Sequence, residues 1–542
     1  MQTRRQLLRA GAGAAATILA PQSLAVAASA PKAQASAILR GGRFPQGVLS
    51  GEPTPRSITL LTLLDRVNAR SGAVRLEIAL DRGFRRVVAR RTIATSRASN
   101  WSVKARVEGL RPYEQYYYRF ETRDESSPVG RFRTALPADS RQPVRFGFFS
   151  CADFTHGYYN AYELMSRLDL DFVINLGDYV YAETYHTKRG GTGVREDRIG
   201  RETDGEGPIA SYTREAVTLA HYRRKYALYR SDASLRKVHA RFPVISVWDD
   251  HEVQDNYAGR APDGGLDAAK RYSLARRRAA YRAFFESMPL FPRGGSRIYR
   301  AQQFGAAVDL IMLDERQYRD DQPCGDAIAP PCAEWDEPRA FLGRGQMGFL
   351  KDRLSGSDAA WKVVGNQLMM MPAKVGPNTY YSFDPWHGHP REREELLAHI
   401  RERQVKDVVF VTGDIHSFFA GDVRTNMGGG DSVALEFVGG SITSQGLGER
   451  DIDLGGGIVI PGNDRNPNTS RVVIDALVGF NPWVDYGDFD HHGFGVVRAT
   501  PSEMQVTFKR MRTIKSRTVA TERDITYRVP RGTTSVKGQH PA

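Results

Sequence analysis

Hydrophobic and polar residues alternate in short runs through the first quarter of the chain. The runs Ser57–Leu64, Val74–Leu80 and Trp101–Val107 alternate or nearly alternate, and turns separate them. Such runs predict β-strands with one buried face. The segment from Gly109 to Phe120 has a proline-containing corner followed by alternating tyrosines, which is typical of immunoglobulin or fibronectin-type sandwiches. We therefore predict a β-sandwich over residues 43–136, with a structural role because it contains no cluster of metal-binding side chains.

After a polar, proline-flanked linker at 137–143, apolar strand-like runs alternate with longer helical segments. The predicted strands are Val144–Phe149, Asp171–Leu176, Val244–Trp248, Val308–Leu313, Trp361–Val364 and Val408–Val411. The predicted helices are Tyr158–Leu168, Arg214–Tyr229, Asp267–Glu286 and Arg391–Arg403. This alternation predicts a layered α/β domain over residues 143–512. Glycine-rich stretches at 189–207, 427–431 and 453–464 are predicted loops, and the basic tail 513–542 is a docking strand, a lid or disordered.

Three predicted strands end in side chains that can bind metal ions. Asp178 and Tyr181 follow the strand Asp171–Leu176, the sequence Asp249-Asp250-His251-Glu252 follows Val244–Trp248, and Asp414 and His416 follow Val408–Val411. Carboxylates, imidazoles and phenols at the ends of neighbouring strands predict one composite site at the edge of a sheet.

Each group of candidate ligands has a particular chemistry and a simpler alternative. Asp178 could bridge two cations, and Tyr181 could bind a ferric ion as a phenolate. The simpler alternative is an aspartate that caps the next segment and a tyrosine of the core. The residues Asp249 to Glu252 could instead cap a helix, although a cap does not need His251. Asp414 and His416 are two positions apart, so an extended backbone would place them on one face, but they could also be a turn carboxylate and a structural histidine.

The chain has three cysteines, an odd number. Cys324 and Cys332 lie in a loop rich in proline and glycine, and they can pair in an oxidising compartment. Cys151 is then left over, so it is either buried and inert or a metal ligand. Its position at the end of the strand Val144–Phe149 favours the role of ligand.

Composition and charge limit the classes of function. A length of 542 residues suggests two or three domains, and 41% hydrophobic with 25% charged residues indicates a soluble globular protein. The net charge of +14 is spread along the chain, which fits a small anionic substrate or an anionic envelope surface. We expect no nucleic acid as a specific partner, because no basic stripe with interleaved aromatic residues is present.

The first 30 residues have the pattern of an export signal. Arg4 and Arg5 are followed by apolar residues rich in alanine and glycine, and Ala25-Val26-Ala27 is a plausible cleavage site. Adjacent arginines in this context are the signature of twin-arginine export, although an ordinary basic N-terminus is the alternative. We therefore predict that the twin-arginine translocon delivers the folded protein to the periplasm or the medium, where disulfides can form.

Taken together, these motifs resemble those of the PhoD-like alkaline phosphatases, within the wider calcineurin-like and purple-acid-type metallophosphatases. The resemblance runs from the leader to about residue 510. Its further matches are Gly365-Asn366-Gln367, Leu342 to Gln346, Glu436 to Thr443 and Phe480-Asn481-Pro482. It implies a four-layer α/β/β/α domain behind the small sandwich.

The resemblance also implies a centre that contains one Fe³⁺ ion and Ca²⁺, with a role for each candidate residue. By motif position, the ligands of iron are Cys151, Tyr181 and His416, and Asp178 bridges iron and calcium. The ligands of calcium are Asp250 and Asp414, and Asn366 is a further ligand of the second metal. His251 contacts the scissile phosphate. Asp249 could replace Asp250 as a direct ligand, or it could support the direct ligands from outside.

The implied function is that of an exported alkaline phosphatase, a monomer that hydrolyses small or envelope-derived phosphate monoesters. A metal-bound hydroxide would attack phosphorus, and His251 would donate a proton to the leaving oxygen. A phosphodiesterase or phospholipase D-type hydrolase could use the same site. A non-catalytic envelope-binding protein is a further alternative. The insertion at 189–207 and the segment Asp485–His492 would line or cover the pocket and affect substrate preference.

Overall fold

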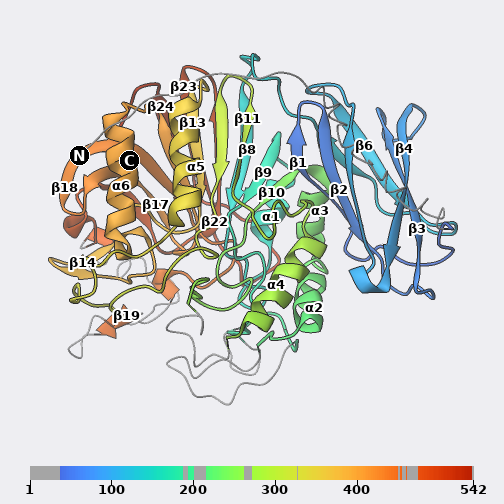
Figure 1. The fold of residues 1–542 in the computed structure, drawn as a ribbon, viewed down its shortest axis with the longest axis horizontal. Helices are drawn as coiled ribbons and strands as arrows, with labels where there is room; N and C mark the ends of the chain where they lie inside the picture. Colours follow the sequence, from blue (N-terminus) through green and yellow to red (C-terminus); the bar gives the residue numbers. More distant parts are fainter. Residues whose placement is uncertain are drawn as a thin grey trace, which may run out of the picture. The chain divides into compact units, whose positions relative to one another are not determined.

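The computed structural model describes residues 37–186, 193–199, 215–261, 272–325, 328–449, 452–453, 459–460, 474–475 and 477–539 (Figure 1). The predicted leader, residues 1–30, lies outside this set, and so do parts of the predicted loops 189–207 and 453–464. Among the described residues, no helix combines the length and the apolar character that a membrane crossing requires.

The N-terminal part is the predicted β-sandwich. Its sheets, in spatial order, are β1 (Val48–Thr54), β2 (Ser57–Leu63) and β5 (Ser102–Glu108), then β4 (Val87–Ser96), β3 (Ser71–Ala79), β6 (Gln115–Glu121) and β7 (Gly130–Arg133). Alternate residues of β6 are buried, as the sequence pattern requires. The corner is closed by the N–H of Arg111, which donates a hydrogen bond to the Tyr116 hydroxyl at 2.9 Å. The sandwich and its tyrosine corner are therefore confirmed.

The larger part contains two mixed sheets. One sheet has the order β10 (Val244–Ser246), β9 (Phe172–Asn175), β8 (Val144–Phe149), β22 (His492–Ala499), β23 (Glu503–Met511) and β24 (Ile525–Pro530). The other has the order β11 (Arg300–Phe304), β12 (Val308–Met312), β13 (Trp361–Asn366), β16 (Val408–Thr412), β18 (Gly429–Gly439), β17 (Phe418–Asn426) and β21 (Val484–Asp488). Strands β8, β9 and β10 are parallel, and so are β12, β13, β16 and β18.

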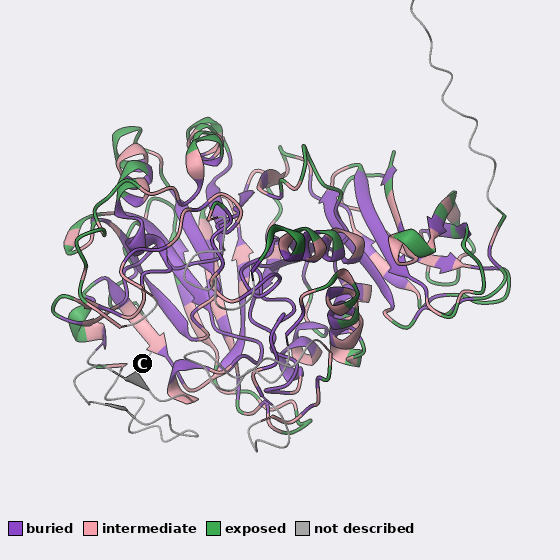
Figure 2. Ribbon diagram, turned by 60° about the horizontal axis from the view of Figure 1, so that its bottom comes forward, coloured by how far each residue is buried: buried purple, intermediate pink, exposed green. Residues whose placement is uncertain are grey.

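Helices cover the outer faces of the two sheets and so complete the four predicted layers. The helices are α1 (Asn160–Met165), α2 (Leu219–Tyr229), α3 (Ala233–Arg241), α4 (Leu274–Ser287), α5 (Gly343–Gly356) and α6 (Pro390–Glu402). Helix α1 contacts β22 and β23 of the first sheet, whereas α6 contacts β17 and β18 of the second. Figure 2 shows the strands of the sheets mostly buried and the exposed residues mainly on helices and loops.

The core between the two sheets is rich in aromatic rings. Phe172 stacks on Phe146 of its own sheet at a centroid distance of 5.1 Å and on Phe304 of the other sheet at 4.1 Å. Phe437 meets Phe508 across the same interface at 6.3 Å. Each such pair contributes about 0.5–1.5 kcal/mol beyond the free energy gained by burying its apolar surface. This packing fixes the relative position of the strand ends that carry the candidate ligands.

Several element boundaries differ from the predicted ones. The helix predicted from Arg214 begins at Leu219, because the side chain of Thr218 accepts a hydrogen bond from the N–H of His221 and caps it. The strand predicted to reach Trp248 ends at Ser246. Helix α3 was not predicted, although Asp232 caps it by accepting hydrogen bonds from Ser234 and Leu235. Of the alternatives for the C-terminal tail, residues 525–530 form a docked strand, β24, beside β23.

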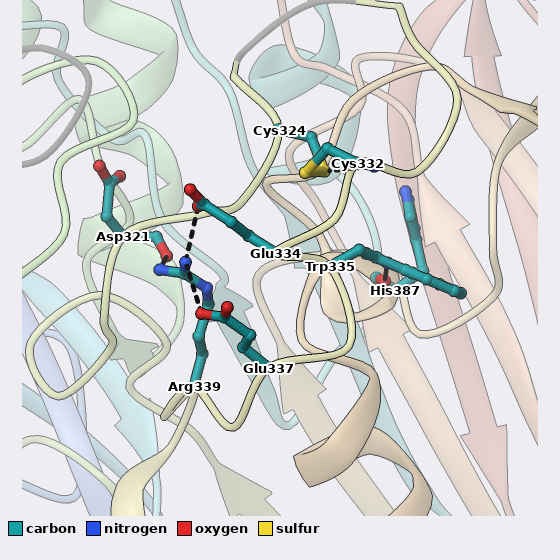
Figure 3. The surroundings of a disulfide bond; sticks show 8 residues. All are labelled: Asp321, Cys324, Cys332, Glu334, Trp335, Glu337, Arg339 and His387. Carbon is teal, nitrogen blue, oxygen red and sulfur yellow. Dashed lines mark hydrogen bonds and ion pairs between the residues drawn. A yellow bond between two sulfur atoms is a disulfide. The ribbon is translucent and has the colours of Figure 1, made fainter.

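The two predicted partners Cys324 and Cys332 form a disulfide (Figure 3). The loop that follows it is held by side chains: Trp335 donates a hydrogen bond to the carbonyl of His387 at 2.7 Å, and Arg339 contacts Glu334 at 2.9 Å. Cys151 is buried and free, as the pairing predicts.

Candidate metal centre

Candidate ligands from both sheets meet because of the strand directions. The parallel strands β8, β9 and β10 lead to Cys151, Asp178 and Asp250, and the parallel strand β16 of the other sheet leads to Asp414 and His416. Ligands of α/β proteins commonly bind at the carboxyl ends of such strands. The structure therefore brings the residues of the three sequence motifs into one site.

The first cluster contains a thiol, a carboxylate, an imidazole and a phenol. Donor atoms of Cys151, Asp178 and His416 all lie within 4.8 Å of one another. The Tyr181 hydroxyl adjoins them, at 3.1 Å from Oδ2 of Asp178 and 3.2 Å from Nε2 of His416. Tyr181 is fully buried with Cys151 and Asp178, so this set of donors is largely shielded from water.

The second cluster is made of carboxylates, and a further group of donors connects it with the first. Donor atoms of Asp249, Asp250 and Asp414 lie within 4.8 Å of one another, and so do those of Asp178, Asp250 and His251. Asp178 thus belongs to the thiol-containing cluster and to a group that includes Asp250. A carboxylate in that position can contact two cations at once.

Four of these residues have left-handed backbone conformations. The φ angles are 58° at Cys151, 53° at Asp178, 64° at Asp414 and 59° at His416. The predicted extended segment from Asp414 to His416 is therefore wrong, because both residues turn back at the end of β16. Left-handed conformations of residues other than glycine cost on the order of 1 kcal/mol each and concentrate at functional sites.

A buried glutamate holds two of the ligand loops together. The Glu252 carboxylate accepts hydrogen bonds from the N–H groups of Asp178, Tyr179 and Asp249 at 2.7–3.0 Å. Burial raises the pKa of Glu252 to about 7 despite these hydrogen bonds. Gly177, with φ of 116°, lets the loops approach, because a Cβ atom there would lie 2.4 Å from that of Asp249.

Arg316 is a central residue that the sequence analysis missed. Its guanidinium is fully buried and lies 2.5 Å from Asp249, 2.8 Å from Asp384, 3.4 Å from Asp250 and 3.9 Å from Asp414. The available signal was the run Asp314-Glu315-Arg316, three charged residues directly after the apolar strand β12. Buried charges of this kind need partners, and here the partners are the carboxylates of the second cluster and Asp384.

The surroundings of Asp249 and Asp250 differ. Asp249 makes the shortest contact with Arg316, from its Oδ1 atom. Oδ2 of Asp250 accepts a hydrogen bond from the N–H of Asn256 at 2.7 Å, but its Oδ1 is buried without a hydrogen-bond partner. Asp250 also belongs to the group with Asp178, whereas Asp249 does not. This geometry favours Asp250 as the direct ligand and Asp249 as the partner of Arg316.

The clustered groups perturb one another's ionisation. Burial, then the neighbouring carboxylates, raise the pKa values of Cys151 and Tyr181 well above their usual range. Burial is also the largest cause that raises the pKa values of Asp178 and Asp414. A cation among these groups would favour their charged forms and so lower these pKa values.

His251 lies beside the clusters and is oriented by a carboxylate. Its Nδ1 atom is 2.8 Å from Glu183, its Nε2 atom is 3.7 Å from Asp250, and its ring stacks on that of Tyr181 at 4.1 Å. Burial lowers the pKa of His251, but Asp250, Asp178 and Glu183 more than offset this, so the pKa lies well above its usual range.

A loop after β18 orients two residues of the first cluster. The Ser444 hydroxyl donates a hydrogen bond to the Tyr181 oxygen at 2.6 Å. The carbonyl of Gln445 lies 2.9 Å from Nδ1 of His416 and can accept a hydrogen bond from it, which leaves the Nε2 lone pair directed at the cluster. Such outer hydrogen bonds fix the tautomer of a metal-binding histidine.

Asn366 is placed differently from the other predicted ligands. It is the last residue of β13 and is fully buried. Its amide oxygen accepts a hydrogen bond from Trp386 at 3.0 Å, and its amide nitrogen donates to Leu368 and Thr412. The amide group of Asn366 thus forms its hydrogen bonds with residues in and next to the second sheet. The role of Asn366 as a metal ligand stays a prediction.

The side chains present fit the two cations that the sequence analysis expects. A thiolate, a phenolate and an imidazole are donors that suit a transition-metal ion, whereas carboxylates suit Ca²⁺. Oδ1 of Asp250 is buried without a hydrogen bond, although Arg316 lies 3.4 Å away. This oxygen and the left-handed turns at four ligands are further features of a binding site.

A second group of titratable residues adjoins the Ser444 loop. The Glu449 carboxylate lies 3.0 Å from Nε2 of His156 and 3.2 Å from Nε2 of His492, and it accepts a hydrogen bond from the N–H of Gly446. The ammonium group of Lys515 lies 2.9 Å from Nε2 of His156, so the chain itself supplies a positive charge here. This ion cluster connects the loops after β8 and β18 with the start of β22.

Glu449→Gln is expected to destabilise the protein by about 2 kcal/mol at neutral pH, because it removes a buried charge with several partners. Burial alone would raise the pKa of Glu449, but His492 and His156 lower it well below its usual value of 4.5. A carboxylate whose pKa is lower in the folded state than in the unfolded state stabilises the fold at pH values above its unfolded-state pKa. This contribution is lost progressively as the pH falls below the unfolded-state pKa. Denaturant unfolding should therefore show a wild-type advantage that shrinks below about pH 4.5; an advantage independent of pH would contradict this.

Comparison with known proteins agrees with this fold. Residues 146–508 match the family model of the PhoD-like phosphatase, and residues 28–136 match that of the PhoD-like phosphatase N-terminal domain. The chain is 33% identical over 529 residues to alkaline phosphatase D of Bacillus subtilis (strain 168), which covers 94% of this chain and 84% of that protein.

Solved structures show the same architecture. A structure of PhoD superposes with a TM-score of 0.78 and 31% identity, covering 91% of this chain and 92% of that one. A purple acid phosphatase from yellow lupin (Lupinus luteus) seeds superposes with a TM-score of 0.53 at 12% identity, covering 89% of this chain and 73% of the lupin chain. The second match concerns the fold alone.

Proposed function

Because the chain belongs to the PhoD-like phosphatase family and is a phosphoric ester hydrolase, we propose that it is an alkaline phosphatase that hydrolyses phosphate monoesters at a centre of two cations. The observation that carries the proposal is the position of Asp178, which belongs to the thiol-containing cluster and also to a group with Asp250 of the carboxylate cluster. A shared carboxylate is what a pair of adjacent cations requires.

We infer a different cation for each side from the types of donor. Cys151, Tyr181 and His416 would hold Fe³⁺, Asp250 and Asp414 would hold Ca²⁺, and Asp178 would contact both. When bound, the cations would supply Lewis acidity, which neutralises charge on the phosphate and makes water a better nucleophile. Arg316 would keep Asp249 and Asp384 paired beside the carboxylate side.

His251 would act on the leaving group. The Nδ1–H group donates a hydrogen bond to Glu183, which fixes the ring so that Nε2 faces the centre. A proton held at Nε2 would pass to the oxygen of the departing alcohol. The Tyr181 ring packs against the imidazole and restricts its rotation.

A chelator and two substrates test the function. Removal of the cations from purified protein should abolish hydrolysis of a nitrophenyl phosphate monoester, and a non-catalytic binding protein would show no such activity before chelation. The monoester should also be hydrolysed faster than the bis-nitrophenyl diester. A faster rate on the diester would replace the proposal by phosphodiesterase activity, which the same centre could support.

His251→Ala should lower kcat on the monoester roughly 10²-fold or more, since one positioned proton donor is lost. The content of both metals should stay unchanged in elemental analysis. Glu183→Gln, which keeps the shape of the His251 partner but not its charge, should lose less activity. If His251→Ala removes a metal instead, His251 is a ligand and not the proton donor.

We also propose export by the twin-arginine translocon and action as a monomer. The adjacent Arg4 and Arg5 before an apolar stretch support export, and the Cys324–Cys332 disulfide fits an oxidising destination. Cell fractionation of Arg4→Lys/Arg5→Lys protein tests this, since unchanged export would contradict it. Gel filtration with light scattering tests the monomer.

A further inference from the structure

A groove with several positive side chains lies between the sandwich and helix α3. Its volume is about 270 Å³, and its lining includes Arg82 from the β3–β4 turn, Tyr117 of β6, Arg131 of β7, and Lys237 and Arg241 of α3. The sandwich therefore contributes to a potential binding site, although its sequence contains no cluster of metal-binding residues.

Three of the four cations lack an acidic partner. Lys237 pairs with Glu163 at 2.8 Å. Arg82, Arg131 and Arg241 form no ion pair with any residue that the structure describes. The positive charge of the groove is thus left uncompensated by the described protein.

Arg131 and Arg241 are also held close together. Nε of Arg131 donates a hydrogen bond to the carbonyl of Arg241 at 3.3 Å, and both guanidinium groups lie over the Phe242 ring, at 5.7 and 5.5 Å. Burial, then repulsion by Arg241 and Arg133, lower the pKa of Arg131, whereas Tyr117 and Asp169 oppose this change. The arrangement keeps two like charges together without a compensating carboxylate.

A buried donor in the groove is unsatisfied. One terminal nitrogen of Arg241 donates to the carbonyl of Leu168 at 3.3 Å, but its Nε is buried and has no hydrogen-bond partner. An orphaned donor of this kind costs about 1–3 kcal/mol. An oxyanion between the two guanidinium groups could accept hydrogen bonds from both and remove this cost.

The groove is separate from the candidate metal centre. Arg241 ends α3 just before β10, and its contact Leu168 precedes β9, so the groove adjoins the amino ends of these strands. The metal-binding candidates follow the carboxyl ends of the same strands. An anion in the groove therefore cannot be the phosphate group undergoing hydrolysis.

We propose that this groove is a second anion site, which binds a phosphate group through Arg131 and Arg241, with Arg82 and Lys237 at its rim. The volume approaches the range of about 300–1,000 Å³ that small-molecule pockets have, so a phosphate and part of the molecule that carries it fit. The phosphate is either free inorganic phosphate or a group of a phosphate polymer. The site does not depend on the catalytic proposal.

Isothermal titration of the metal-loaded protein with inorganic phosphate, and separately with short linear polyphosphate, tests the site. The double variant Arg131→Ser/Arg241→Ser should bind at least one of these anions at least 10-fold more weakly than wild type. Its kcat on a small monoester should be unchanged. The matched control Arg278→Ser/Arg344→Ser removes two exposed arginines from α4 and α5 and should bind as wild type.

The two titrations separate the sources of phosphate. A loss confined to inorganic phosphate supports a site for the free ion, and a loss confined to polyphosphate supports a polymer site. Equal affinities of the groove variant and the control for both anions would overturn the proposal. If the serine variant has a lower thermal midpoint, the variant Arg131→Lys/Arg241→Lys provides a second test. It keeps the positive charge but loses the paired N–H donors, and it should also bind the anion more weakly than wild type.

Discussion

His416→Ala protein is expected to contain no iron and to lose activity by on the order of 10³-fold or more, since the Lewis acid of one side is gone. Nε2 of His416 lies 3.2 Å from the Tyr181 oxygen, and the Gln445 carbonyl directs it there. The expected visible absorption of a tyrosinate–iron pair should disappear, as it should in Tyr181→Phe. Elemental analysis and absorption spectra provide the measurement.

Asp414→Ala should behave differently, because Asp414 belongs to the carboxylate cluster. Iron should be retained, and the calcium concentration needed for half-maximal activity should rise. His399→Ala serves as the control for loss of a histidine, since His399 lies on α6 and contacts Ser355. Full iron content in His416→Ala, or loss of iron alone in Asp414→Ala, would contradict the proposed division of ligands.

Arg316→Met should destabilise metal-depleted protein by about 3–5 kcal/mol, the usual cost of leaving buried charges without their partner. The change removes the contacts with Asp249 at 2.5 Å and Asp384 at 2.8 Å. Cations bound at the carboxylate cluster would offset part of this loss. The midpoint of urea unfolding should therefore fall more in chelated protein than in metal-loaded protein.

A buried pair elsewhere provides the control for this comparison. Arg300 contacts Glu52 at 2.6 Å at the junction of the sandwich with the larger part, and no residue of the metal centre takes part. Arg300→Met should destabilise the protein to the same extent with and without metals. If the loss in Arg316→Met is equally independent of metals, Arg316 has no electrostatic link to the cation site.

The alternation of strands and helices could be predicted from the sequence because it depends on local periodicity. Strands such as β9, β13 and β16 are buried on both faces and appear as continuous apolar runs. The later strands β17, β18 and β22 were not predicted, since they mix buried glycine and polar residues with apolar ones. Their pairing depends on neighbours far away in the chain.

The candidate ligands were recognised for a similar local reason. Asp178, Asp250 and His416 each follow an apolar strand within a few residues, so that their polarity marks the end of the strand. Arg316 and Glu183 were missed, because their roles come from contacts with residues more than sixty positions away. No spacing within the chain indicates such contacts.

The sequence by itself determined which residues could act: a thiol, phenol, imidazoles and carboxylates at the ends of apolar strands, since side-chain chemistry and strand periodicity are local properties. Only the tertiary structure decided how these residues are divided between the two donor clusters. Packing of two sheets places Asp178 in groups with both Cys151 and Asp250, pairs Asp249 with Arg316 and leaves Oδ1 of Asp250 without a hydrogen bond. It also turns Asp414 and His416 back through left-handed conformations, which long-range contacts stabilise against their local cost.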